Sequence, residues 1–122
     1  MADTLVPASN GRHGLGGSRD ADLEGIDPNR YDVFTTDKNL AAARRAYPNY
    51  DWFACFSVKD KQGNYANVSY TLSFNKPASG GTLYYFLNGT AHQLSYADGP
   101  NKGNQPRVRA TLNVGDPPIG MT

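Results

Sequence analysis

Cysteine and histidine are scarce in this sequence. Its 122 residues include one cysteine, Cys55, and two histidines, His13 and His92. A single cysteine excludes an internal disulfide, which fits a reducing compartment. The three positions have no spacing typical of metal ligands, so we expect neither a metal nor any other cofactor. The sequence therefore argues against disulfide-held scaffolds and zinc modules.

The chain also lacks a long apolar run and a strong charge of either sign. No run approaches the length that crosses a bilayer, and no basic start is followed by an apolar stretch. We expect a protein made in the cytoplasm, without membrane insertion, that is open to incorporation into a virion or another assembly. The net charge is +1, so no global field recruits nucleic acid or an anionic membrane.

A strict alternation of apolar and polar residues marks residues 66–74. Every even position is apolar or aromatic, and every odd position is small and polar. The apolar set is Ala66, Val68, Tyr70, Leu72 and Phe74. Successive side chains of a β-strand point to opposite faces, so this pattern predicts a strand with one buried and one solvated face.

Further strands are predicted at residues 31–35, 52–58, 82–87, 90–96 and 107–114. Asn88-Gly89 predicts a two-residue type I′ hairpin turn. A short surface helix is expected from Lys38 to Tyr47, capped by Thr36 or Asp37 and stopped by Pro48. The connections are short, which predicts a meander of about six antiparallel strands closed into a β-sandwich or small barrel.

The strand at residues 52–58 is apolar on both faces. Trp52 shares one face with Ala54, Phe56 and Val58, and the other face carries Phe53, Cys55 and Ser57. A strand of this kind is typical of the centre of a sheet that is covered on both sides.

Both ends of the chain are predicted to lie outside the β domain at residues 31–115. Residues 1–30 are rich in glycine between Asn10 and Ser18, and their apolar residues follow no period. We expect an extended N-terminal arm that is mobile unless a partner orders it. Residues 116–122 form a proline-rich tail that cannot continue a strand, because Pro117 and Pro118 lack backbone donors.

No catalytic constellation emerges, and we expect a protein that is not an enzyme. Cys55 and His92 would form a dyad only if their strands were adjacent, and a buried structural cysteine is the favoured interpretation. The nucleophile elbow of hydrolases and the lysine-containing phosphate loop are both missing from the sequence.

The first functional hypothesis is a structural subunit that self-assembles into a homo-oligomeric particle or filament. A β domain with an arm is the plan of subunits such as virion, capsid or phage structural proteins, and fold does not fix function. The partners would be copies of the chain or another structural protein. The candidate assembly residues are Leu5, Val6, Leu15, Leu23, Ile26, Pro117 and Ile119.

The alternative hypothesis is a β module that binds a carbohydrate or another small ligand around the 96–104 loop. Exposed aromatic faces stack on sugars, and amides and carboxylates bind hydroxyl groups. The candidate residues are Tyr84, Tyr96, Asp98, Asn101 and Asn104. Nucleic acid is not an expected partner, beyond weak phosphate contacts by Arg44, Arg45, Arg107 and Arg109.

Overall fold

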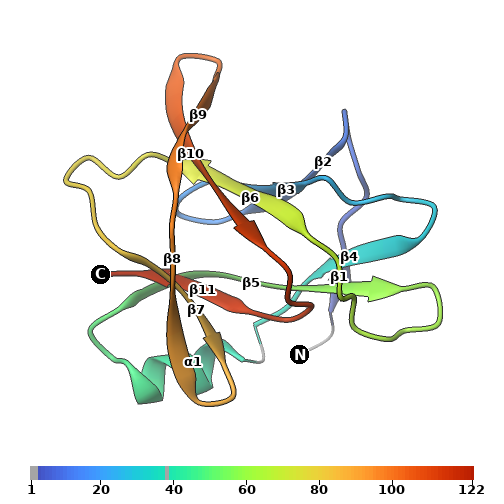
Figure 1. Cartoon of the computed structure of the whole chain (residues 1–122), viewed down its shortest axis with the longest axis horizontal. Coiled ribbons are helices and arrows are strands. Elements are labelled where there is room, and N and C mark those ends of the chain that lie inside the picture. Colours follow the sequence, from blue (N-terminus) through green and yellow to red (C-terminus); the bar gives the residue numbers. More distant parts are fainter. Residues whose placement is uncertain (1–2, 38) are drawn as a thin grey trace.

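Two antiparallel sheets, packed face to face, form the computed structural model, which describes residues 3–37 and 39–122 (Figure 1). The first sheet has the order β1 (Thr4–Leu5), β4 (Tyr31–Thr35), β5 (Asp51–Asp60), β11 (Pro118–Met121), β7 (Leu83–Leu87) and β8 (Thr90–Leu94). The second has the order β2 (Arg12–Gly16), β3 (Ala21–Glu24), β6 (Tyr70–Asn75), β10 (Gln105–Leu112) and β9 (Ala97–Lys102). Of the two predicted architectures, a β-sandwich and a small barrel, the structure shows the β-sandwich, with eleven strands among the described residues where about six were predicted.

Strand β6 carries the alternation that the sequence shows most clearly. Tyr70, Leu72 and Phe74 are at most 2% exposed and fill the space between the sheets. The strand begins at Tyr70 rather than at Ala66, and it pairs with β3 on one side and β10 on the other. The predicted strand at residues 31–35 coincides with β4.

The predicted meander is wrong. Strand β11 lies between β5 and β7, and β10 lies between β6 and β9. Residues 97–106, between the predicted strands at 90–96 and 107–114, contain a further strand, β9, which pairs with β10 across a register shift. The apolar face of each sheet is buried only when it packs on the other sheet. The chain therefore crosses between the two sheets, and strands that are consecutive in sequence do not always pair with each other.

The N-terminal segment is not a free arm. Strands β2 and β3 form a hairpin, and β3 pairs with β6 in the second sheet. Leu23 is fully buried and Ile26 is 8% exposed. The glycine content led to the wrong prediction, because Gly11, Gly16 and Gly17 adopt positive φ at the turns that flank a short strand. Met1 and Ala2 lie outside the described residues.

The C-terminal segment is a strand and not a tail. Ile119 is fully buried and Met121 is 2% exposed, and β11 pairs with both β5 and β7. Pro118 occupies the first position of the strand, where a missing backbone donor is tolerated. Strand β11 therefore joins β5 to β7 at the centre of the first sheet.

A bulge in β5 reverses the predicted faces of two aromatic residues. The register passes from Ala54 opposite Ile119 to Trp52 opposite Gly120, so Phe53 has no partner on β11. Phe53 turns into the core, where its ring centroid lies 5.4 Å from that of Phe74. Trp52 turns outward instead and joins Cys55 in the second apolar cluster. An extra residue on one strand shifts the alternation by one position.

Helix α1 (Leu40–Ala46) covers the outer face of the first sheet. Leu40 and Ala43 pack in one apolar cluster with Trp52. The N-cap is Asn39 without a side-chain capping bond, in place of the predicted Thr36 or Asp37, and Lys38 lies outside the described residues.

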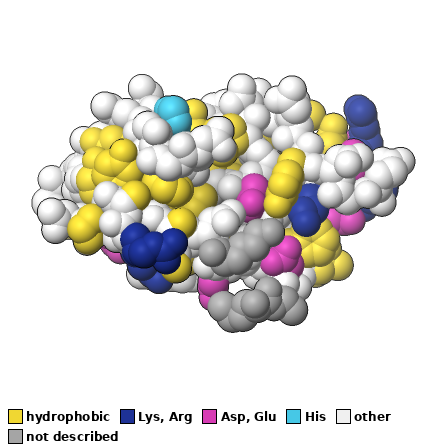
Figure 2. Space-filling model, turned by 90° about the horizontal axis from the view of Figure 1, so that it is seen from below, with side chains coloured by type: hydrophobic (Ala, Val, Ile, Leu, Met, Phe, Trp, Pro, Cys, Tyr) yellow, Lys and Arg dark blue, Asp and Glu magenta, His cyan; other side chains and the backbone are white. Residues whose placement is uncertain are grey.

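Figure 2 views the molecule from the side that α1 covers and shows hydrophobic side chains gathered near one end, beside Lys and Arg side chains. No helix in the described ranges has the length and hydropathy to span a bilayer.

Candidate functional site

A cavity of about 490 Å³ opens at the end of the sandwich where four connections meet. The connections are the start of α1, the β5–β6 loop, the β7–β8 turn and the β10–β11 segment. We call this cavity the amide pocket. Its lining is Asn39, Ala42, Tyr65, Ala66, Asn67, Phe86, Leu87, Asn88, Asn113, Val114, Gly115, Asp116 and Pro118.

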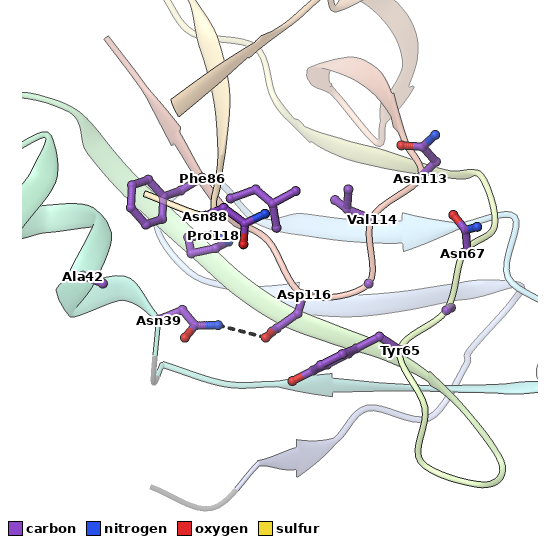
Figure 3. Close-up of a pocket in the computed structure, with 13 residues that line it drawn as sticks. Asn39, Ala42, Tyr65, Asn67, Phe86, Asn88, Asn113, Val114, Asp116 and Pro118 are labelled. Carbon is purple, nitrogen blue, oxygen red and sulfur yellow. Dashed lines mark hydrogen bonds between the residues drawn. The ribbon is translucent and has the colours of Figure 1, made fainter. Parts of the chain in front are cut away.

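The carboxylate of Asp116 is held in a fixed orientation (Figure 3). The Ser57 hydroxyl donates to Oδ1 of Asp116 at 3.0 Å, and the Nδ2 amide of Asn39 donates to Oδ2 at 2.9 Å. Ser57 is fully buried, so the network is anchored in β5. A carboxylate has about four acceptor sites, and two donors leave room for a ligand hydroxyl.

The Tyr65 ring forms one wall of the amide pocket. The residue is 52% exposed, and Figure 3 shows the ring below Asp116 with its hydroxyl directed toward Asn39. Gly115 makes this position possible, because a Cβ there would lie 2.8 Å from Cβ of Tyr65. On the same ring, the Lys59 ammonium lies 5.2 Å from the centroid. An exposed aromatic face next to a carboxylate is therefore built into this loop.

Three further asparagines, Asn67, Asn88 and Asn113, present exposed side chains from three different connections. Within the residues that the structure describes, none of the three amides has a hydrogen-bond partner. The φ of 53° at Asn88 and 81° at Gly89 match the predicted type I′ turn, which fixes the Asn88 backbone. Figure 3 places Asn67 and Asn113 across the pocket from Asn39.

The chemistry available in the amide pocket is hydrogen bonding and stacking. Its lining contains amides, one carboxylate and one phenol, together with apolar surface from Phe86, Val114 and Pro118. Among the described residues of the lining there is no histidine, cysteine or lysine.

The residues of the 96–104 hypothesis do not converge on one site. Tyr84 packs against Tyr50 on the outer face of the first sheet, with ring centroids 4.7 Å apart. The Tyr96 hydroxyl donates to the Gly81 carbonyl oxygen at 2.6 Å, and the Asp98 carboxylate pairs with Lys76 at 3.0 Å. The β9–β10 hairpin bears both Asn101 and Asn104, far above β7 in Figure 1.

The proposed assembly residues are mostly inside the domain. Leu23, Ile26, Pro117 and Ile119 are buried, and Val6 and Leu15 are half-buried against the core. Leu5 alone of the seven is exposed, at 53%. Six of these side chains pack on their own domain, which leaves them little or no surface for another subunit.

The four arginines named as possible phosphate contacts differ in their exposure to solvent. Arg107 is 3% exposed and bound to Asp22, so its guanidinium cannot reach a phosphate. Arg44, Arg45 and Arg109 are exposed. The Arg44 guanidinium donates to the Trp52 carbonyl oxygen at 3.5 Å, and that of Arg109 pairs with Glu24 at 3.8 Å.

The structure also bears on two other chemistries, a Cys55–His92 dyad and a metal site. Cys55 on β5 and His92 on β8 are separated by β11 and β7, so they do not form a dyad. Over the described ranges, no three His, Cys, Asp or Glu side chains are grouped to hold a metal ion.

Sequence reasoning missed the amide pocket because each of its polar residues has an ordinary local explanation. The sequence pattern placed Asn67 on the polar face of a strand, Asn88 in a hairpin turn and Asp116 in the C-terminal tail. The available signal was the repeated placement of asparagine in the connections between apolar segments. Only the topology brings those connections to the same end of the sandwich.

Comparison with known proteins identifies no family for this chain. No protein-family model matches the chain, and neither a curated protein nor a solved structure is significantly similar to it. The geometry of the amide pocket is therefore the basis on which a function is inferred.

Proposed function

We propose that this chain is a non-catalytic binding module that holds a neutral, hydroxyl-rich ligand, a short carbohydrate, in the amide pocket. The observation that carries the proposal is the Asp116 carboxylate, oriented by Ser57 and Asn39 beside the exposed Tyr65 ring. Sugar hydroxyls both donate and accept, so they match a carboxylate surrounded by amides. The apolar face of a sugar ring matches the face of an aromatic side chain.

The size and charge of the amide pocket agree with this ligand class. Its volume of about 490 Å³ falls within the range of about 300–1,000 Å³ that small-molecule sites occupy. Asp116 is the only charged residue among the described residues of the lining. A negative charge at the centre disfavours phosphate or carboxylate ligands, because like charges repel at short distance.

Assembly through an N-terminal arm is not part of this proposal. An assembly arm requires that residues 1–30 do not pack on their own domain, whereas Leu23 and Ile26 lie in the core. The carbohydrate hypothesis is retained with its site moved from the 96–104 loop to the amide pocket.

A glycan array probed with the labelled full chain tests the proposal, followed by calorimetry with the glycans that bind. We expect Tyr65→Ala, and separately the Asn67→Ala/Asn113→Ala pair, to weaken binding at least tenfold, which corresponds to about 1.4 kcal/mol. The matched control is Asn101→Ala/Asn104→Ala, which removes two amides from the β9–β10 hairpin and should leave affinity unchanged.

Two outcomes would contradict the proposal. One is an array without any bound glycan. The other is a bound glycan whose affinity responds to the Asn101/Asn104 control and not to the pocket variants, which would return the site to the 96–104 loop. Circular dichroism of each variant confirms that a lost affinity is not a lost fold.

A further inference from the structure

Strand β8 is an unprotected sheet edge. The described part of the sandwich has four edge strands, namely β1 and β8 in the first sheet and β2 and β9 in the second. Edge strands expose unpaired backbone groups, and proteins block them with charge, proline, bulges or short length. Strand β1 has two residues, and β2 carries Arg12 and a register shift after Gly14. Strand β9 carries Asp98, Pro100 and Lys102.

Strand β8 has none of these protective features. Its sequence, Thr-Ala-His-Gln-Leu, contains no charged residue other than a titratable histidine, and no proline. All five residues pair with β7 in continuous register, from Thr90 opposite Leu87 to Leu94 opposite Leu83. Thr90, His92 and Gln93 are exposed. The edge is therefore regular, nearly neutral and accessible.

The β7–β8 turn decides which backbone groups are free. In a two-residue hairpin the residues that flank the turn, here Leu87 and Thr90, form a hydrogen-bonded pair. Bonded and non-bonded pairs alternate along an antiparallel ladder. Thr90, His92 and Leu94 therefore direct their backbone groups to β7. Ala91 and Gln93 direct their N–H and C=O groups away from the sheet.

We propose that β8 pairs with β8 of a second copy, antiparallel and around a two-fold axis at His92. His92 is the midpoint of the five-residue strand, so Ala91 of each copy meets Gln93 of the other. Each such pair exchanges two hydrogen bonds, and the two pairs satisfy the free groups of both copies. The first sheets of the two copies then form one continuous sheet.

A second copy fits this edge better than a foreign peptide does. Peptides that add to a sheet edge are selected by pockets for alternate side chains. No described residue of β8 lines the amide pocket or any of three further surface cavities. A two-fold pairing is self-complementary and closes at two subunits. The three protected edges oppose growth beyond the dimer. Four hydrogen bonds with little apolar contact make a weak dimer that depends on concentration.

Position 92 allows a test by charge exchange. In the proposed dimer the two His92 side chains face each other across the axis, so a lysine in both copies, or a glutamate in both, would place like charges opposite one another. His92 is exposed and stacks on Tyr85 with ring centroids 4.9 Å apart, and both substitutions remove that stacking equally. Sedimentation velocity of the full chain over a wide concentration range measures the result.

We expect a monomer–dimer equilibrium for the unmodified chain and monomers for His92→Lys and His92→Glu alone. An equimolar mixture of the two variants should dimerise, because opposite charges then meet at the axis. Asn104→Lys, which adds the same charge in the β9–β10 hairpin, should dimerise like the unmodified chain. Amide hydrogen exchange gives a second measurement: protection of Ala91 and Gln93 should rise with concentration, and that of His92 should not.

Three results would overturn the proposal. They are an unmodified chain that stays monomeric at every concentration, a dimer that persists in both charged variants, and a mixture of those variants that stays monomeric. Circular dichroism of the variants verifies that they remain folded.

Discussion

The Asp22 carboxylate Oδ2 lies 2.7 Å from Nη2 of Arg107, and the two side chains are 6% and 2% exposed. This buried ion pair ties the N-terminal hairpin to β10, across 85 residues of sequence. Arg107 also donates from Nη1 to Asn75 Oδ1 and to the Asp20 carbonyl oxygen. The pair thus joins three strands on the outer face of the second sheet.

Removing one member of this pair should destabilise the fold strongly. Asp22→Asn removes the buried counter-charge of Arg107 and leaves only the half-exposed Asp20 carboxylate, 3.7 Å from Nη1. We expect a loss of about 3–5 kcal/mol in unfolding free energy. Urea denaturation measures it. Lys61→Ala breaks the exposed pair with Asp32 and should cost about 0–1 kcal/mol. The double variant Asp22→Leu/Arg107→Met should lose less than Asp22→Asn, because no unpaired charge remains. Equal losses for Asp22→Asn and Lys61→Ala would contradict the assignment.

Tyr70 should make the protein sensitive to alkali. Burial raises the pKa of its phenol above the usual 10.0, and the Asp116 charge raises that pKa further. The stabilisation is complete below pH about 10, where the unfolded phenol is still protonated, and is lost as pH rises toward the folded pKa. Tyr70→Phe should therefore flatten the fall in stability above pH about 10 by up to about 1.4 kcal/mol per pH unit.

The same variant should also lose stability at neutral pH. The Tyr70 hydroxyl donates to the Val114 carbonyl oxygen, so its removal leaves a part-buried acceptor without this donor. The expected cost is about 1–3 kcal/mol. Urea denaturation from pH 7 to alkaline pH, with the unmodified chain in parallel, separates the two effects. Parallel curves for the two proteins would rule out the buried phenol as the cause.

Gly120 leaves the space that the Trp52 ring occupies. A Cβ at position 120 would lie 2.5 Å from Cε3 and 2.8 Å from Cδ2 of Trp52, and 3.1 Å from the Asp51 carbonyl oxygen. The ring is rigid and 3% exposed, so Gly120→Ala should cost about 1–3 kcal/mol through overpacking. Gly14→Ala is the matched strand control, since nothing lies within 4 Å of its Cβ position, and should change stability by no more than about 0.5 kcal/mol. Similar values for both would refute the packing argument.

Ile119 and Leu5 separate core residues from surface residues among the positions first assigned to assembly. Ile119 is fully buried between β5 and β7, whereas Leu5 is 53% exposed. We expect Ile119→Ala to cost about 2–5 kcal/mol by leaving a cavity. Leu5→Ala should stay within about 0.5 kcal/mol. Thermal and urea unfolding measure both, and a stable Ile119→Ala protein would mean that β11 is dispensable.

Local signals in the sequence were sufficient for the strands with regular patterns. The alternation of Tyr70, Leu72 and Phe74 identified β6, and Asn88-Gly89 identified the β7–β8 turn. Such features depend on residues close in sequence, where side-chain alternation and allowed φ values act directly. Together these signals predicted an antiparallel β-sandwich or small barrel, and the structure shows the sandwich.

Only the tertiary structure decided the roles of the chain ends and the composition of the amide pocket. Leu23 and Ile119 sit in segments with weak strand propensity, and they become strands because β6, β5 and β7 offer free edges beside an open core. Asn39, Asn67 and Asp116 are far apart in sequence and meet only because the strand order brings their connections to one end. Local propensity carries no information about such long-range pairing, since the decisive free energy comes from burial that no short segment achieves alone.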